Sequence, residues 1–207
     1  GIAAASVKTV NGIAAASVKT VMNETLLLTV DQATNSLSTN LGTHTGTERR
    51  SWGLASCYDP DTNQVIFVYG DSRNNEYSTA VVMAADKSIG SAVVIQSTGA
   101  GFHNGPVYNT QENKIMINYM ASHSNNDYYM VGGTVGTKTI TVNNSGRGTV
   151  HDGSTGNAQG DVTDVASYNP TANVAVAAFE DGSDSAKNKA VACTIGSDNS
   201  ITVGTPV

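Results

Sequence analysis

The side chains of this sequence that could do chemistry are mainly scattered carboxylates. Asp152, Asp161 and Asp164 follow His151 within one glycine-rich stretch. Hydrolysis of a glycoside needs two carboxyl groups held across the sugar, one of them with a raised pKa. An enzyme acting on acidic sugars would add an arginine cluster, and the only arginines are Arg49, Arg50, Arg73 and Arg147. We therefore expect no catalytic residues and no enzymatic activity.

A second group of side chains is suited to binding rather than catalysis. Aromatic faces stack on sugars, and neighbouring amides donate and accept paired hydrogen bonds. Tyr128 and Tyr129 have a structural alternative, because aromatic residues commonly open strands. Long glycine-rich loops also carry function more often than short ones. The candidate ligand-binding residues are Arg73, Asn75, Tyr77, His123, Asn126, Tyr128, Tyr129, His151 and Asp152.

These candidates lie around a six-residue phrase that occurs three times. Each copy has Tyr first, Asp or Asn second and Asn sixth, and an aromatic residue ends the apolar run that follows. The copies are Tyr58-Asp-Pro-Asp-Thr-Asn63, Tyr108-Asn-Thr-Gln-Glu-Asn113 and Tyr168-Asn-Pro-Thr-Ala-Asn173, and the aromatic residues are Tyr69, Tyr119 and Phe179. Repetition at this scale indicates an array of similar supersecondary units.

Each unit has the pattern of four short antiparallel strands. In the first copy, Asp-Pro-Asp-Thr-Asn is a turn signal, and strands are predicted over 52–58, 64–69, 78–84 and 89–96. The later copies predict strands over 114–119, 128–134 and 139–143, and over 174–179, 189–194 and 200–203. Residues 146–161 contain five glycines and are predicted to form an enlarged surface loop. Four strands in about 50 residues is the size of one β-propeller blade.

We predict an all-β fold, a β-propeller-like array of about three and a half four-stranded blades with an extended N-terminal arm. The expected boundaries are an arm over 1–23 and a repeat domain over 24–207. Within it, 24–47 is a partial blade, and 48–100, 101–150 and 151–207 are blades. A stacked sheet array or a sandwich of the same hairpins is the alternative packing.

The arm is itself a repeat. Gly1 to Val10 recurs identically at Gly12 to Val21. Eleven-residue periods can mark helical coils, but Asn11-Gly12 between two apolar stretches is a strong turn signal. Two short strands, or an extended arm that docks onto another protein, are therefore favoured over a helix; a flexible leader is the alternative.

Composition excludes several classes of partner. The net charge is −6 with only eleven lysines and arginines, so no basic stripe exists for a nucleic acid. No apolar run is long enough to insert into a membrane. Cys57 and Cys193 occupy non-equivalent places in different copies, so two separate thiols are expected rather than a disulfide. The histidines and cysteines have no metal-ligand spacing, and no metal or cofactor is expected.

The repeats resemble those of virion proteins of tailed bacteriophages, notably fibre and adhesin proteins of marine phages. The likeness is carried by Tyr58-Asp59, Asn63, Tyr69, Asp71, Asn74, Asn75, Tyr77 and Thr79 to Val82, by Tyr168 to Asn173, Asp181 and Ile201 to Val207, and by Asn11-Gly12 with Ser17 to Val21. The second copy departs from the pattern, with Ala121 where the others have Asp71 and Asp181. That acidic position is therefore predicted to be a turn device rather than a binding centre.

The resemblance implies a structural protein of the virion, located on the particle surface and outside the cell. We expect a tail-fibre or adhesin subunit that attaches to a host surface polysaccharide through its blade loops. We also expect a homo-oligomer whose N-terminal arm contacts other virion proteins. The first alternative is an architectural subunit, such as a capsid decoration, collar or tail component. The second is a secreted propeller that binds or cleaves glycans.

Overall fold

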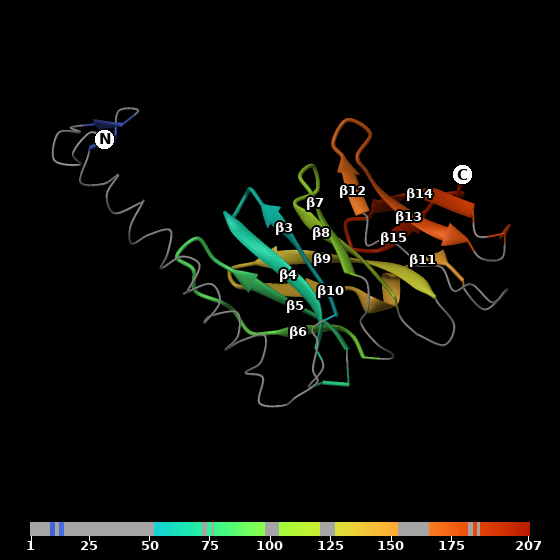
Figure 1. Ribbon diagram of the computed structural model, residues 1–207, viewed down its shortest axis with the longest axis horizontal. Coiled ribbons are helices and arrows are strands. Elements are labelled where there is room, and N and C mark those ends of the chain that lie inside the picture. Colours follow the sequence, from blue (N-terminus) through green and yellow to red (C-terminus); the bar gives the residue numbers. More distant parts are fainter. Residues whose placement is uncertain are drawn as a thin grey trace, which may run out of the picture. The chain divides into compact units, whose positions relative to one another are not determined.

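The computed structural model describes residues 9–10, 13–14, 52–71, 74–75, 77–97, 104–120, 127–152, 166–181, 184–185 and 187–207 (Figure 1). The chain divides into two compact units, residues 1–43 and 44–207. In the first unit, β1 (Thr9–Val10) and β2 (Ile13–Ala14) pair antiparallel around Asn11-Gly12. This pairing is what an Asn-Gly turn between two apolar stretches favours.

The second unit contains three antiparallel sheets, each with its strands in chain order. The first sheet is β3 (Trp52–Asp59), β4 (Gln64–Asp71), β5 (Tyr77–Met83) and β6 (Val93–Gln96). The middle sheet is β7 (Asn104–Asn109), β8 (Lys114–Met120), β9 (Tyr128–Gly136) and β10 (Thr139–Val142), and β11 (Gly148–His151) also pairs with β9. The third sheet is β12 (Ala166–Asn169), β13 (Val174–Asp181), β14 (Lys187–Ile195) and β15 (Ile201–Val203).

The all-β prediction is confirmed, and most predicted strands match within two residues. Two differences stand out. Residues 146–161, expected to be a loop, contribute the end of a short 3₁₀ helix, η3 (Asn144–Gly146), and then β11. The fourth strand of the first copy begins at Val93, and Ile89 makes only an isolated bridge with Met83. The described residues of the second unit form three sheets and no closed ring, and the expected partial blade at 24–47 lies outside the described residues.

The repeated phrase folds into the same turn in all three copies. The side-chain oxygen at its second position accepts hydrogen bonds from the backbone N–H groups two and three residues later. The distances are 2.9 and 3.3 Å for Asp59, 3.0 and 3.0 Å for Asn109, and 3.0 and 3.2 Å for Asn169. The sixth residue has a left-handed backbone, with φ of 54°, 55° and 53° at Asn63, Asn113 and Asn173. Asn tolerates this conformation better than other residues with a Cβ.

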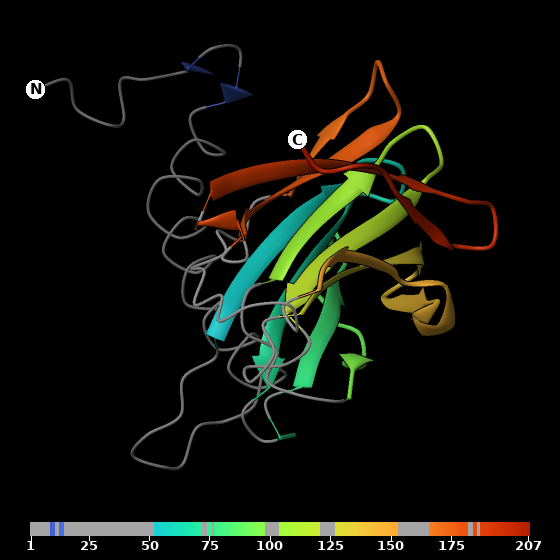
Figure 2. The ribbon, with the colours of Figure 1, turned by 90° about the vertical axis from the view of Figure 1, so that its right-hand side faces the viewer.

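The three turns are hydrogen-bonded to one another. Tyr108 of the second turn donates its hydroxyl to Asp61 of the first, at 3.1 Å. Asn173 of the third turn accepts from Asn109 at 2.9 Å and donates to Glu112 at 3.1 Å. Consecutive sheets are therefore aligned by their turns, and their first strands β3, β7 and β12 are neighbours in space (Figure 2).

The residue after each of the first two phrases reaches the next sheet. Gln64 donates to Gly136 O at 3.0 Å and accepts from the Lys138 N–H at 2.8 Å, both in the β9–β10 hairpin. Lys114, one copy later, donates to Gly196 O at 2.5 Å in the β14–β15 hairpin. These buried polar groups find their hydrogen-bond partners in the neighbouring sheet. The bonds therefore fix the offset of one sheet relative to the next.

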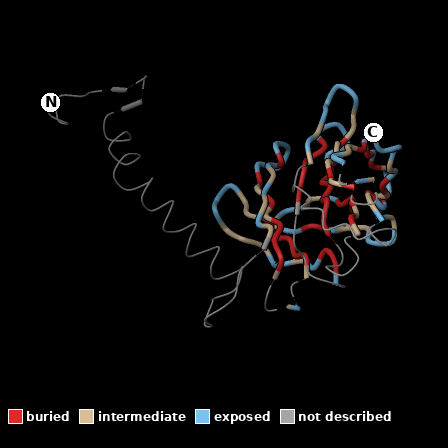
Figure 3. Tube along the Cα trace, turned by 45° about the vertical axis from the view of Figure 1, so that its right-hand side comes forward, coloured by how far each residue is buried: buried red, intermediate tan, exposed pale blue. Residues whose placement is uncertain are grey.

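Two hydrophobic cores fill the spaces between the sheets (Figure 3). We call the face of a sheet turned to the next sheet along the chain its front, and the opposite face its back. The first core joins the front of the first sheet to the back of the middle sheet, and includes Ile66, Val68, Ile115 and Ile117. The second joins the front of the middle sheet to the back of the third, and includes Met116, Met130, Ala175, Ala177 and Phe179. Every residue of β8 is buried.

The two cysteines lie in different cores and are free thiols. Burial, with a smaller contribution from Asp59, raises the pKa of the Cys57 thiol to about 12. Burial alone raises the pKa of Cys193 from 9.0 to about 11. Both thiols are therefore protonated at neutral pH, and a protonated thiol is a poor nucleophile.

The bonds between turns predict a difference between two matched variants. Asn173→Gly and Asn63→Gly both preserve the left-handed backbone and remove one amide. Asn173 bridges to the middle sheet, whereas Asn63 accepts only from the Tyr58 hydroxyl, at 2.9 Å, among the described residues. We expect Asn173→Gly to cost about 1–3 kcal/mol of unfolding free energy in urea titrations and Asn63→Gly less than about 1 kcal/mol. Equal losses would show that the turn ladder adds no stability.

Alkaline pH provides a second test, of the core. Because the pKa of Cys193 is raised on folding, the stability contributed by the buried, protonated thiol is fully present below pH 9 and is lost between pH 9 and about 11. Over that window, ionisation of the thiol should lower the unfolding free energy by roughly 1.4 kcal/mol per pH unit. Cys193→Ala should therefore weaken the pH dependence of the urea midpoint, measured in reductant from pH 7 to 11. Parallel curves for the variant and the parent would contradict the buried thiol.

Candidate functional site

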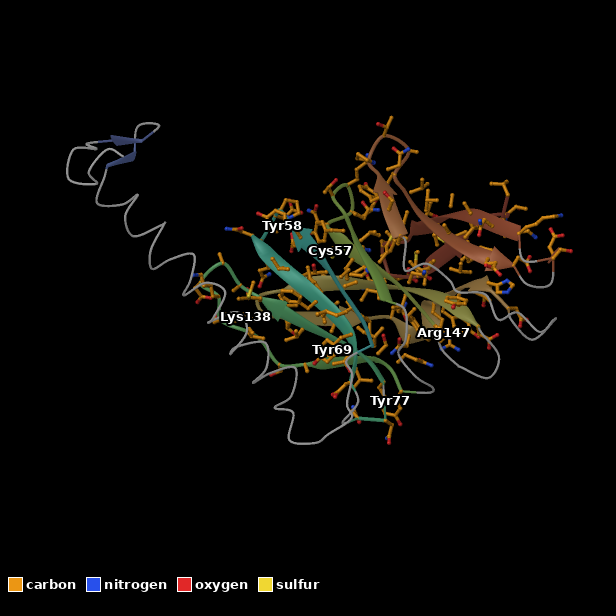
Figure 4. All side chains as sticks on the ribbon, in the orientation of Figure 1. Cys57, Tyr58, Tyr69, Tyr77, Lys138 and Arg147 are labelled. Carbon is orange, nitrogen blue, oxygen red and sulfur yellow. The ribbon has the colours of Figure 1, made fainter. Side chains whose placement is uncertain are left out.

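The turns and the loops lie at opposite ends of the sheets. The phrase turns and the β5–β6, β9–β10 and β14–β15 hairpins share one end, which we call the turn end. The connections that follow β4, β6, β8, β11 and β13 leave from the other, which we call the loop end. In Figure 4, Tyr58 lies at the turn end, and Tyr69, Tyr77 and Arg147 lie toward the loop end.

Arg147 marks the loop end of the interface between the first and middle sheets. Its guanidinium carbon lies 4.1 Å from the centroid of the Tyr129 ring, and Nη1 donates to Gln96 Oε1 at 3.4 Å. Tyr129 in turn lies against Tyr119, with the ring centroids 6.1 Å apart. A cation over an aromatic face is held by the ring quadrupole and loses side-chain freedom.

The local sequence explains how Arg147 reaches this position. Asn143 caps η3 by accepting from the Gly146 N–H at 3.0 Å, and β11 then pairs with the first residues of β9. Gly146 and Gly148, on either side of Arg147, lie against the third sheet. A Cβ would come within 3.0 Å of Ser200 Cα at Gly146, and within 2.4 Å of Val203 Cγ2 at Gly148. These glycines therefore permit close packing, which holds Arg147 in place.

The electrostatics leave Arg147 able to receive a ligand. Its side chain is exposed, and it forms no ion pair with any carboxylate of the described residues. Beneath it, Tyr119 is fully buried, and its hydroxyl has no hydrogen-bond partner in the described part of the chain. Burial raises the pKa of Tyr119, and the nearby guanidinium of Arg147 opposes this rise. The guanidinium can thus bind a carboxylate or a pair of hydroxyls.

The loop end of the interface between the middle and third sheets is less polar. The His151 ring stacks on Phe179, with centroids 5.1 Å apart. His151 Nε2 and Asn118 Oδ1 are buried and have no hydrogen-bond partner among the described residues. All three buried, unpartnered side-chain atoms of the described structure, counting Tyr119, therefore lie near the loop end.

Charged residues at the loop end of the third sheet neutralise one another. Lys189 pairs with Asp181 at 2.7 Å and with Asp184 at 3.2 Å, and Lys187 pairs with Asp184 at 2.9 Å. Hydrogen bonds from both lysines lower the pKa of Asp184. Lys189, with its pKa raised by the same carboxylates, is occupied within the protein. This group therefore offers a ligand less than Arg147 does.

The structure places six of the nine candidate residues. Asn75 and Tyr77 are brought together, with the amide donating to the hydroxyl at 3.4 Å. Tyr128 is buried and donates its hydroxyl to Met120 Sδ at 3.3 Å. Tyr129 and His151 are partly buried, in the two interfaces described above, and Asp152 is exposed after β11. Arg73, His123 and Asn126 lie outside the described residues.

The sequence analysis did not predict that Arg147, Gln96 and Tyr119 come together at the loop end. Tyr119 was assigned to the repeat pattern, and Gln96 to the end of a strand. Arg147 was counted only as one of four arginines, although its flanking glycines were a signal of close backbone packing. Reading those glycines as loop residues hid the strand that carries the guanidinium to Tyr129.

Comparisons with known proteins add no family. No protein-family model matches the chain, and no curated protein matches it. Within the described residues, no helix has the length and hydropathy needed to cross a membrane.

Proposed function

We propose that this chain is a non-enzymatic structural protein of a phage virion, of the tail-fibre or adhesin type. In this role it attaches the particle to a host surface glycan through the loop end of its sheets. The phage assignment is supported by the resemblance of the repeats described above. The binding role is supported chiefly by Arg147, an exposed guanidinium that stacks on Tyr129 and forms no ion pair among the described residues, in a chain of net charge −6.

The same residues indicate which part of a glycan would be bound. One face of the Arg147 guanidinium covers Tyr129, so the Tyr129 face on that side is not a free stacking platform. The free edge of the guanidinium carries parallel donors that match a carboxylate or two neighbouring hydroxyls. Surface polysaccharides present both groups, and many weak sites on one particle would reinforce each other by avidity.

The proposal also treats the three sheets as consecutive blades of a propeller-like array. Its support is the neighbouring first strands β3, β7 and β12 and the front-to-back packing of four-stranded sheets. In such an array, loops that join second to third strands, and one blade to the next, gather at one end. The N-terminal arm, residues 1–23, would contact other virion proteins.

A specific observation favours the architectural alternative. The first sheet exposes three large side chains, Leu54, Tyr58 and Val94, which suits a subunit that packs against neighbours in a particle. Immunogold labelling of intact particles separates the roles. Label at distal fibre tips supports attachment, and regular label over the head or tail shaft supports architecture.

Arg147 carries the binding prediction. Arg147→Ala should lower the affinity for an acidic polysaccharide, identified on an array of acidic and neutral bacterial glycans, by about tenfold or more. Lys138→Ala is the matched control, since it removes one cation at the turn end, where Lys138 lies 3.8 Å from Asp86. Isothermal titration calorimetry measures both. Equal affinities for the parent and Arg147→Ala would rule out Arg147 as the binding residue.

A further inference from the structure

Gln96 reaches Arg147 because the pairing of β5 with β6 is irregular. The register shifts between Ser78 and Thr79, which leaves Ile95 as an extra residue in β6. Such a bulge re-aims the side chains that follow it, and bulges are frequent beside functional sites. Here it puts Gln96 on the front of the first sheet, where the side chain is buried and its Oε1 accepts from Arg147 Nη1 at 3.4 Å.

The described residues that contact Arg147 offer it neutral groups. Gln96 provides an amide oxygen, and Tyr129 provides the face of its ring, with the centroid 4.1 Å from the guanidinium carbon. The nearby phenol of Tyr119 stays protonated at neutral pH, because burial raises its pKa. These contacts restrict the orientation of the guanidinium, but none of them compensates its positive charge.

Two lysines show how this protein holds a cation elsewhere. Lys189 Nζ lies 2.7 Å from Asp181 Oδ2, and Lys138 Nζ lies 3.8 Å from Asp86 Oδ2. A carboxylate at position 96 would orient Arg147 in the same way, but it would also neutralise the guanidinium. An amide oxygen at that position keeps the orientation and leaves the charge available to a ligand.

We propose that Gln96 is a positioning residue that makes this site selective for a carboxylate, such as that of a uronic acid, over neutral hydroxyl groups. The inference rests on the proposed glycan binding at Arg147 and narrows it to one chemical group. A carboxylate accepts two parallel N–H bonds from a guanidinium and supplies the negative charge that the described contacts lack, whereas a pair of hydroxyls supplies hydrogen bonds alone. The neutral side chain at position 96 therefore allows the ligand, rather than the protein, to compensate the charge of Arg147.

Charge substitution at position 96 tests this inference. Gln96→Glu keeps the side-chain size and adds a competing carboxylate, whereas Gln96→Met removes the hydrogen bond without adding a charge. Gln111→Glu is the matched control, because it adds the same charge to an exposed turn of the middle sheet, at the turn end.

The probe is sodium glucuronate, and glucose is its neutral counterpart. Nuclear magnetic resonance of the full chain follows the Nε–H signal of Arg147 during each titration and gives the dissociation constant. Circular dichroism verifies that each variant keeps the fold of the parent.

We expect the Arg147 signal of the parent and of Gln111→Glu to shift with glucuronate and not with glucose. Gln96→Glu should raise the dissociation constant for glucuronate by about tenfold or more, since the ligand must displace an internal ion pair. In the free Gln96→Glu variant, the Arg147 signal should already lie near its position in the glucuronate-bound parent, which a purely structural role of Gln96 would not produce. Gln96→Met should raise the dissociation constant only about threefold, because one hydrogen bond is lost and stacking on Tyr129 remains.

Three results would overturn the inference. Equal affinities of the parent and Gln96→Glu for glucuronate would show that the charge at position 96 does not matter. Equal losses in Gln96→Met and Gln96→Glu would show that Gln96 acts through packing or hydrogen bonding alone. An Arg147 signal of the parent that responds to glucose as strongly as to glucuronate, or to neither, would show that the site does not select carboxylates, and this result needs no variant.

Binding to the array of acidic and neutral bacterial glycans separates failure of this inference from failure of the proposed function. A neutral polysaccharide that the parent binds and Arg147→Ala binds less tightly would overturn carboxylate selectivity and leave glycan attachment through the loop end standing. A parent that binds no glycan on the array would contradict the proposed function and this inference together.

Discussion

The structure depends on one local feature, a turn in which a side-chain oxygen accepts hydrogen bonds from the backbone of the same turn. At each phrase, an Asp or Asn oxygen accepts two backbone N–H groups, and a left-handed Asn completes the reversal. Because each turn is closed by one side-chain oxygen, the other polar groups of the phrase are free to bond to a neighbouring turn. Asp61, Asn109 and Asn173 make those bonds and bring the sheets into register.

The alignment of the turns has consequences at both ends of the sheets. It stacks the sheets face to face, so that β8 is buried along its whole length between two cores. It also sends the other connections to the opposite end, where they take no part in the turn ladder. Arg147 lies at that end, and it is held by stacking on Tyr129 rather than by a carboxylate among the described residues. The turn ladder and the proposed binding residue Arg147 thus lie at opposite ends of the same strands.

The sequence predicted the all-β class and most strand positions, because the phrase combines turn chemistry with apolar runs of strand length. It predicted the polar turns but not their contacts, since Asn173 and Glu112 are far apart in sequence and meet only after the sheets stack. It missed β11 because Gly146 and Gly148 are typical of loops, whereas here they allow the backbone to approach Ser200 and Val203. Whether the array closes depends on the angle between sheets, which no local pattern encodes.

The central claim is that packing between sheets provides the stability, so that the middle sheet, which packs on both faces, is held more firmly than the third sheet. Strand-resolved hydrogen exchange of the dilute, monomeric chain tests it most directly, because exchange of core amides reports the local free energy of opening. The account predicts the slowest exchange in β8, which is covered on both faces, and faster exchange in β13, which is covered on one. Exchange in β13 as slow as in β8 would contradict it.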